Sequence, residues 1–271
     1  MSPLQKLSVL CFVTFGLAAC GGGGGGGDAG GGEPAGNGEA EPAPEAGNAD
    51  ATPPANATGA VAGKVALEGT PPERMPLNVS SDPVCIAVSQ GMPPKSEEVI
   101  SQAGGLGNVF VWVSKGLEGK RFPPPRQPVA FDQKGCVYSP HVFGVRVGQT
   151  IRITNSDPTL HNVHTLPKAN QELNQGQPKG SGPIELKFRR PEPETMVKVK
   201  CEVHTWMNAY AGVVEHPYFA VSEPNGAFEF AEKLPPGKYT VSAWHEKYGK
   251  KDQEVDVAEG DNQVSFTFEA K

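Results

Sequence analysis

The stretch that decides the fold reads Met196-Val-Lys-Val-Lys-Cys201-Glu-Val-His204-Thr-Trp-Met207-Asn-Ala-Tyr210-Ala-Gly-Val-Val214. The residues before Cys201 alternate apolar and polar side chains, as a half-buried strand does, and a second strand is predicted from Tyr210 to Val214. The loop between the two strands holds a thiol, an imidazole and a thioether within seven residues. With one more imidazole from upstream, these groups are the donor set of a copper site for single-electron transfer.

Short β-rich runs recur along most of the chain and are bounded by Gly, Pro, Asn and Asp. Clear alternation marks the runs Phe143–Val147, Thr150–Thr154 and Val264–Phe268. Turn signals spaced about ten residues apart are typical of β-sandwiches, and no segment shows a convincing helical period. The sequence therefore predicts an all-β protein.

The Cys-x2-His-x2-Met spacing of the loop resembles the cupredoxin family, in its amicyanin-like form, and its Cys-x2-His half resembles plastocyanin. The run Val147–Asn155, followed by His161-Asn162-Val, is similar to the upstream half of the same family. The resemblance covers roughly residues 107–215. It implies a Greek-key β-sandwich with one type 1 copper ion, whose ligands are His161, Cys201, His204 and Met207. It also implies that Asn162 steadies the Cys loop, because groups around a metal site usually orient its ligands.

Two other histidines are alternative ligands. His164 follows His161 by three residues, so a strand would aim the two side chains at opposite faces and only one can reach Cys201. We take His161, which occupies the position of the family motif. His141 is a second alternative, predicted to pack or hydrogen-bond beneath the site. Zinc is the rival metal, but a thioether is not a zinc ligand.

The C-terminal part carries a second resemblance. An Asn225-Gly226 hairpin turn and the run Leu234-Pro-Pro-Gly-Lys-Tyr239 are similar to the carboxypeptidase regulatory-like domain, a small β-sandwich. The segment from Gly63 to Pro72 resembles the first strand of that fold. We therefore expect a cupredoxin-like domain at 107–216 and a smaller sandwich at 217–271. Residues 59–106 form a β segment that, by hypothesis, completes the C-terminal sandwich.

The first 58 residues are predicted to lie outside any fold. Residues 1–19 read as a signal peptide, and the small residues before Cys20 resemble a bacterial lipoprotein box, which implies lipidation of Cys20. Residues 20–58 are rich in Gly, Pro and acid, a composition typical of a disordered tether. We expect a cell-envelope protein held by its lipid anchor, with the outer membrane favoured, facing the periplasm or the cell surface.

Most of the net negative charge of the chain lies in these first 58 residues. The chain has 24 basic and 30 acidic residues, and six of those acids but only one of the bases precede residue 59. The remainder is nearly neutral and has no basic stripe, which argues against nucleic acid as a partner.

The cysteine count predicts a disulfide. Of five cysteines, Cys11 lies in the signal peptide, Cys20 at the lipidation site and Cys201 in the metal loop. Cys85 and Cys136 are left, and an exported chain favours their pairing. The alternative is a metal site that joins Cys136 to His141.

The leading functional hypothesis is an electron carrier rather than an enzyme, because the usual nucleophile, paired-carboxylate and phosphate-loop motifs are missing from the sequence. Electrons are expected to cross a solvent-near edge of His204, with Trp206 in an apolar docking patch for redox partners. The alternatives are a copper delivery or storage module, and a structural surface lipoprotein without redox turnover.

Overall fold

The computed structural model describes residues 54–192 and 195–270. The predicted signal peptide, Cys20 and most of the predicted tether lie outside the described residues. Within them the chain is nearly all β, as predicted, with 18 strands and one short helix, α1 (Pro83–Val88). That part of the chain contains no helix with the length and apolar character needed to cross a membrane.

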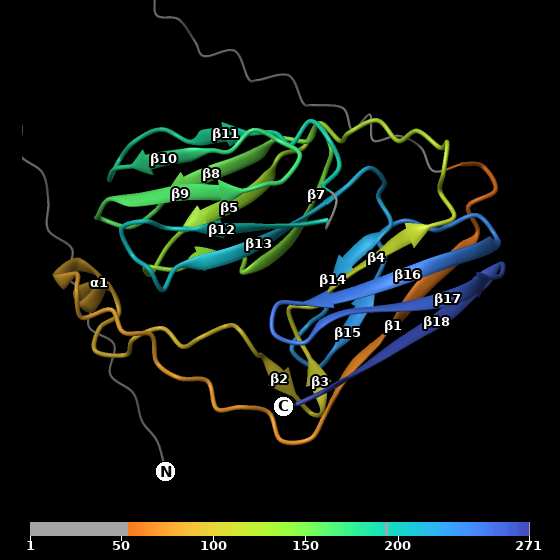
Figure 1. Cartoon of the computed structure of the whole chain (residues 1–271), viewed down its shortest axis with the longest axis horizontal. Coiled ribbons are helices and arrows are strands. Elements are labelled where there is room, and N and C mark those ends of the chain that lie inside the picture. The colour runs from red at the N-terminus through yellow and green to blue at the C-terminus, as the bar shows by residue number, and fades with distance from the viewer. Residues whose placement is uncertain (1–53, 193–194, 271) are drawn as a thin grey trace, which may run out of the picture. The chain divides into compact units, whose positions relative to one another are not determined.

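Nine strands form a sandwich that we call the inserted sandwich (Figure 1). One sheet has the order β10-β9-β12-β13-β7 and the other the order β11-β8-β5-β6. The strands are β5 (Val129–Gln133), β6 (Tyr138–Ser139), β7 (Val142–Arg146), β8 (Ile151–Asn155), β9 (His161–Leu166), β10 (Asn174–Gln177), β11 (Ile184–Leu186), β12 (Met196–Lys200) and β13 (Asn208–Val214). Buried Phe, Val and Ile side chains from both sheets form one core, which also contains Cys201 and Met207.

The remaining nine strands form a second sandwich, which we call the outer sandwich. One sheet has the order β15-β1-β3-β2, with β18 also paired to β1, and the other the order β14-β4-β16-β17. The strands are β1 (Gly59–Glu68), β2 (Ser101–Gln102), β3 (Gly105–Leu106), β4 (Phe110–Lys115), β14 (Phe219–Val221), β15 (Ala227–Glu229), β16 (Gly237–His245), β17 (Gly249–Val257) and β18 (Gly260–Glu269).

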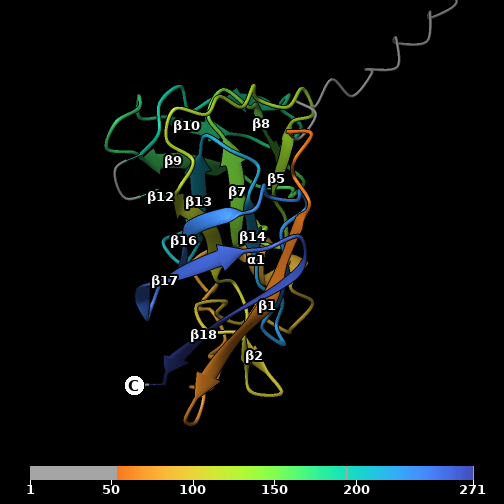
Figure 2. The ribbon, with the colours of Figure 1, turned by 90° about the vertical axis from the view of Figure 1, so that its right-hand side faces the viewer.

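The N-terminal segment and the C-terminal segment share one sheet. Strand β1 lies parallel to β18 over ten residue pairs and antiparallel to β15 (Figures 1 and 2). The buried side chains of β1, among them Val61 and Val65, pack into the same core as Phe266 and Phe268 of β18. Residues 59–106 thus supply strands to the sandwich that residues 217–271 form, and the second sandwich is as rich in strands as the first.

The predicted boundary at residue 107 differs from the structure. Strand β4 was expected in the cupredoxin-like domain, but it lies between β14 and β16 in the outer sandwich. The reason is its four consecutive buried residues, Phe110–Val113. Val111 and Val113 face the outer core, and Phe110 and Trp112 pack in a cluster with Val142 and Val214 of the inserted sandwich. A strand buried on both faces belongs at the contact between two layers.

Close contact between the sandwiches depends on a glycine. Gly212 of β13 lies against the ring of Phe110, and a Cβ atom built at this position would come within 2.3 Å of that ring. Phe110 is fully buried and its ring stacks on Trp112, with 5.4 Å between ring centroids. Because buried rings have little room to move, only glycine fits here.

Gly212→Ala should lower the free energy of unfolding by about 1–3 kcal/mol through overpacking. Gly182→Ala is the matched control, because a Cβ there meets no atom within 4 Å. The control should change stability by less than about 0.5 kcal/mol. Urea denaturation measures both variants, and equal stabilities would contradict the described packing.

A buried neutral histidine makes the outer sandwich sensitive to acid. His245 is fully buried, and its ring stacks on Tyr248. Its Nδ1 accepts a hydrogen bond from the backbone N–H of Lys247. Burial, assisted by the charges of His141 and Lys247, lowers the pKa of His245 to about 4. The unfolded chain would titrate near the ordinary value of about 6.5.

The free energy of unfolding should therefore fall as pH decreases from about 6.5 to about 4, by up to about 3 kcal/mol from this residue, because only the unfolded chain binds the proton in that window. His245→Asn removes the titration and keeps an acceptor for Lys247. Denaturation curves across this range should show a smaller loss for His245→Asn than for the unaltered protein. Parallel pH profiles would show that His245 is not the cause.

Candidate metal centre

The Cys201–Met207 loop is a compact turn closed by its own backbone. The N–H of Cys201 donates to the carbonyl of Met207, and the N–H of Met207 donates to the carbonyl of His204. The N–H of His204 donates to Cys201 Sγ over 3.3 Å. These bonds return the chain directly into β13 and fix Cys201 and His204 on the same side of the turn.

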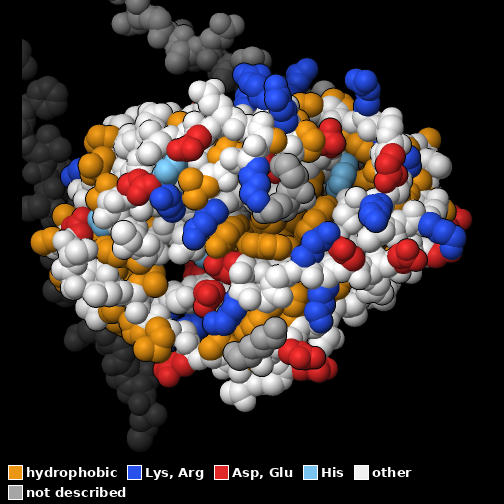
Figure 3. Space-filling view, in the orientation of Figure 1, with side chains coloured by type: hydrophobic (Ala, Val, Ile, Leu, Met, Phe, Trp, Pro, Cys, Tyr) orange, Lys and Arg blue, Asp and Glu red, His pale blue; other side chains and the backbone are white. Residues whose placement is uncertain are grey.

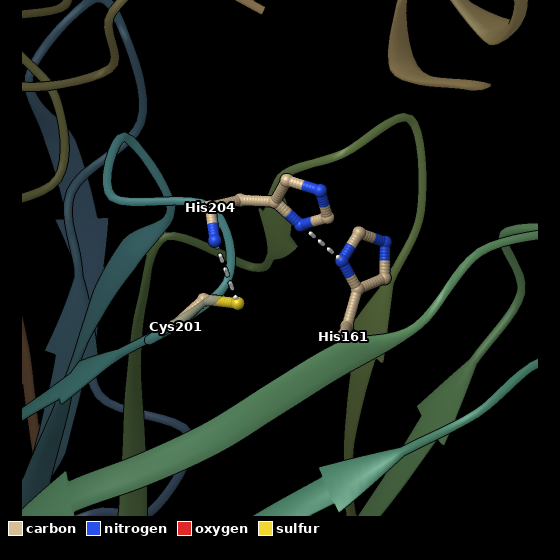
Figure 4. A group of neighbouring side chains, drawn as sticks. All are labelled: His161, Cys201 and His204. Carbon is tan, nitrogen blue, oxygen red and sulfur yellow. Dashed lines mark hydrogen bonds between the residues drawn. The ribbon is translucent and has the colours of Figure 1, made fainter. Parts of the chain in front are cut away.

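His161 reaches this loop because of the register between β9 and β12. The two strands are antiparallel, with Lys200 opposite His164, so the start of β9 extends beyond the end of β12 and lies beside the loop. One side-chain nitrogen or sulfur atom from each of His161, Cys201 and His204 lies within 4.8 Å of the other two (Figure 4). The Nδ1 atoms of the two imidazoles face each other at 2.9 Å.

A carboxylate engages the far nitrogen of each imidazole. Asp157 Oδ2 lies 2.9 Å from His161 Nε2, and Asp82 Oδ2 lies 2.8 Å from His204 Nε2. A ligand histidine usually donates its other ring N–H to such a group, which fixes its tautomer and the orientation of its ring. The Nδ1 atoms are thereby left as the nitrogens that could bind a metal, and they point toward each other and toward the thiol.

Hydrogen bonds around the cluster shift the pKa values of two of its residues, Cys201 and His161. Burial raises the pKa of Cys201, but hydrogen bonds from His161 and from the backbone N–H groups of His204, Asn162 and Val203 outweigh burial and lower it. The thiolate, which binds metals, is therefore favoured. Burial lowers the pKa of His161, but its hydrogen bonds to Asp157 and Cys201 outweigh this and raise the pKa to about 9. In the metal-free protein at neutral pH His161 is therefore an imidazolium, which must lose a proton before its Nδ1 can bind a cation.

Two other predicted residues lie beside the cluster. Met207 is 1% exposed and packs in the same core as Cys201. Asn162 Oδ1 accepts the backbone N–H of Glu202 at 3.2 Å, so this side chain holds the loop at the residue after Cys201. A thiol, a thioether, two imidazole nitrogens and an apolar floor fit copper better than zinc, because a thioether is not a zinc ligand.

The two alternative histidines lie outside the cluster. His164 points to the other face of β9, where Nδ1 contacts Glu202 and Nε2 lies 2.5 Å from Glu172. Hydrogen bonds to these two glutamates raise the pKa of His164. His141 pairs with Glu246 of the outer sandwich. Both rings already have carboxylate partners.

Cys85 and Cys136 form a disulfide, so the alternative of a metal site joining Cys136 to His141 is wrong. Cys201 is the free cysteine of the described residues. The disulfide lies beside the candidate metal centre, and Cys85 Sγ is 3.7 Å from His204 Nε2.

The expectation that His204 presents a solvent-near edge is also wrong. The residue is only 1% exposed. Two residues occupy the space at its Nε2 edge. Asp82 is the N-cap of α1, and Cys85 lies within that helix. A chain segment from outside both sandwiches covers the ring, whereas Trp206 beside it stays partly exposed.

Sequence reasoning missed Asp82 and Asp157. Asp157 had a usable signal, because it precedes His161 by four residues in a turn-forming Asn-Ser-Asp-Pro run. Asp82 had none, because it lies 122 positions before His204 and the segment around it resembles no known metal-binding motif.

Comparisons with known proteins give matches only among solved structures. No family model matches the chain, and no curated protein does. An oxidized mutant of amicyanin is 21% identical over 32% of this chain and 81% of its own, with a TM-score of 0.28. A purple cupredoxin from Nitrosopumilus maritimus is 23% identical over 31% of this chain and 98% of its own, with a TM-score of 0.26.

A copper-containing nitrite reductase from Thermus scotoductus SA-01 also matches, at 19% identity and a TM-score of 0.30 over 36% of this chain. This chain spans only 24% of the reductase. All these TM-scores lie below 0.5, so the case for a metal centre depends on the donor atoms of this chain.

The geometry distinguishes the three residues whose side chains converge from a nearby histidine that points away. His161→Ala, Cys201→Ala and His204→Ala should each abolish stoichiometric Cu2+ binding, because each removes one of the converging donor atoms. His164→Ala is the matched control, since it removes an imidazole from the opposite face of the same strand. Equilibrium dialysis with metal analysis measures the stoichiometry, and loss of binding in His164→Ala alone would contradict this ligand set.

Proposed function

We propose that this protein carries single electrons through one type 1 copper ion held by His161, Cys201, His204 and Met207. The observation that supports the proposal is the convergence of a buried thiol of lowered pKa with two imidazole Nδ1 atoms. Copper, when bound, would supply the one-electron Cu(II)/Cu(I) couple that the side chains lack.

The chain's own residues provide a rigid and dry setting for that couple. His161 and Cys201 are anchored to paired strands, and all three donor residues are at most 2% exposed. Asp157 and Asp82 hold the rings by their far nitrogens. A donor set that cannot rearrange, and that water does not reach, changes little when the charge at its centre changes. This property suits electron transfer rather than catalysis, which needs an open coordination position.

A delivery or storage role for Cu(I) is the second candidate. The observation that favours it is the cover over His204, because the ring edge that a redox partner would approach is buried. A storage protein must release its metal, whereas a carrier must keep it through many cycles.

We further propose that the protein is anchored in the cell envelope by a lipid on Cys20, at the outer membrane, with residues 20–58 as its tether. Its partners would then be redox proteins of the periplasm or cell surface, and not nucleic acid. On the face of the described residues shown in Figure 3, acidic and basic side chains are interspersed, a distribution unlike a phosphate-binding stripe.

The copper-loaded protein should show an intense visible band from thiolate-to-Cu(II) charge transfer, and Cys201→Ser should remove it. Chemical reduction should bleach the band, and reoxidation should restore it over repeated cycles with the metal retained. Absorption and electron-paramagnetic resonance spectra, with metal analysis after each cycle, make the test. Loss of copper on reduction would favour storage or delivery, and a protein without affinity for copper would leave only a structural role.

A further inference from the structure

Asp82 contacts the candidate centre from a segment that belongs to neither sandwich. Its Oδ2 atom lies 2.8 Å from His204 Nε2, and the two side chains are 18% and 2% exposed. The residue precedes α1, and Figure 1 places this short helix apart from the sheets of both sandwiches. The contact therefore adds a third part of the chain to a site built from β9 and the β12–β13 loop.

The carboxylate of Asp82 is fixed in position on both of its oxygens. Oδ1 accepts the backbone N–H groups of Val84 and Cys85, at 2.7 and 3.4 Å, which makes Asp82 the N-cap of α1. Oδ2 also accepts the hydroxyl of Thr159 at 3.2 Å. An anion held in this way can only present one orientation to His204.

The disulfide connects Asp82 to the carboxylate that holds the other imidazole. Cys85 of α1 is bonded to Cys136 in the β5–β6 connection. The backbone N–H groups of Gly135 and Cys136 each donate to Asp157 over 2.7 Å. Asp157 in turn contacts His161. One covalent bridge thus links the two carboxylates that orient the two rings.

From this arrangement we infer that Asp82 is a positioning residue of the metal centre. It holds the His204 ring with Nδ1 directed at Cys201 and His161. The disulfide keeps Asp82 and α1 in place as a cap over the Nε2 edge. The inference rests on the proposed copper site and adds a residue and a cover that the ligand loop itself does not contain.

Two substitutions distinguish an effect of Asp82 on the His204 ring from an effect on the folding of α1. Asp82→Ala removes both the helix cap and the acceptor for His204, whereas Asp82→Asn keeps the cap through its one side-chain oxygen and replaces the acceptor facing His204 with an uncharged amide N–H donor. Asp132→Ala is the matched control. Asp132 lies in β5 of the inserted sandwich and accepts hydrogen bonds from Thr154, Ser156 and Gln133, none of which is a proposed metal ligand.

The full-length, copper-loaded proteins are compared by competition with a chromogenic Cu(I) chelator and by redox titration. Asp82→Ala should bind copper about 10–100-fold more weakly, the usual effect of removing the partner of a ligand histidine. Asp82→Asn keeps the cap but not the acceptor, so it should also bind copper more weakly than the unaltered protein. Its reduction potential should be higher, because loss of a nearby negative charge disfavours Cu(II) relative to Cu(I). Asp132→Ala should match the unaltered protein in both measurements.

A purely structural role for Asp82 would leave the potential of Asp82→Asn unchanged, and that result would overturn the inference even if Asp82→Ala fails to fold. Unaltered affinity in a folded Asp82→Ala would also overturn it. An unaltered protein that binds no copper would instead refute the proposed function. The two failures are therefore distinguishable.

The cap is tested by Cys85→Ala/Cys136→Ala. Without the bridge, α1 should cover His204 less persistently, and copper should pass to the chelator faster than from the unaltered protein. Circular dichroism checks that the variant folds. An unchanged transfer rate in the folded variant would show that the disulfide does not hold the cap.

Discussion

The 2.9 Å contact between the Nδ1 atoms of His161 and His204 is the interaction on which the candidate centre depends. Two imidazoles and a thiol are buried in an apolar core, where polar groups without partners are costly. Hydrogen bonds offset this cost. Asp157 and Asp82 contact the far nitrogens of the two rings, and the backbone N–H of His204 donates to the sulfur. The two Nδ1 atoms and Cys201 Sγ are left facing one another, and these are the three atoms that could hold a cation.

The two sandwiches of the described residues are joined at one end of the inserted sandwich. The outer sandwich closes with β1 beside β18, so residues near both ends of the described chain share one sheet. The inserted sandwich then begins and ends at the same place, where β4 and β14 pair and where Phe110 lies against Gly212. Both connections to the inserted sandwich are thus held by strand pairing and by packing.

Local pattern predicted the strand–loop–strand unit around Cys201, because β12, the turn and β13 are contiguous and a few residues show their alternation. It could not predict contacts over long separations. β4 was assigned to the wrong sandwich, since a strand buried on both faces reads the same in either. The six residues of α1 are too few to show a helical period, so the helix and its Asp82 cap were not predicted. The prediction of an exposed His204 edge was wrong for the same reason, because the covering residue Asp82 lies 122 positions before His204.

The cover over His204 changes where an electron would have to leave the protein. Under the proposed function, the ring edge is blocked by Asp82 and by Cys85, and Trp206 is a partly exposed aromatic side chain beside the ring. Its ring centroid lies 4.9 Å from that of His204, and its Nε1 donates to the carbonyl of Cys136. The same disulfide that braces the histidines therefore also fixes this indole. A partner that docks over Trp206 would approach the centre from the side, which explains how a buried ligand ring and an electron-transfer role can coexist in one fold.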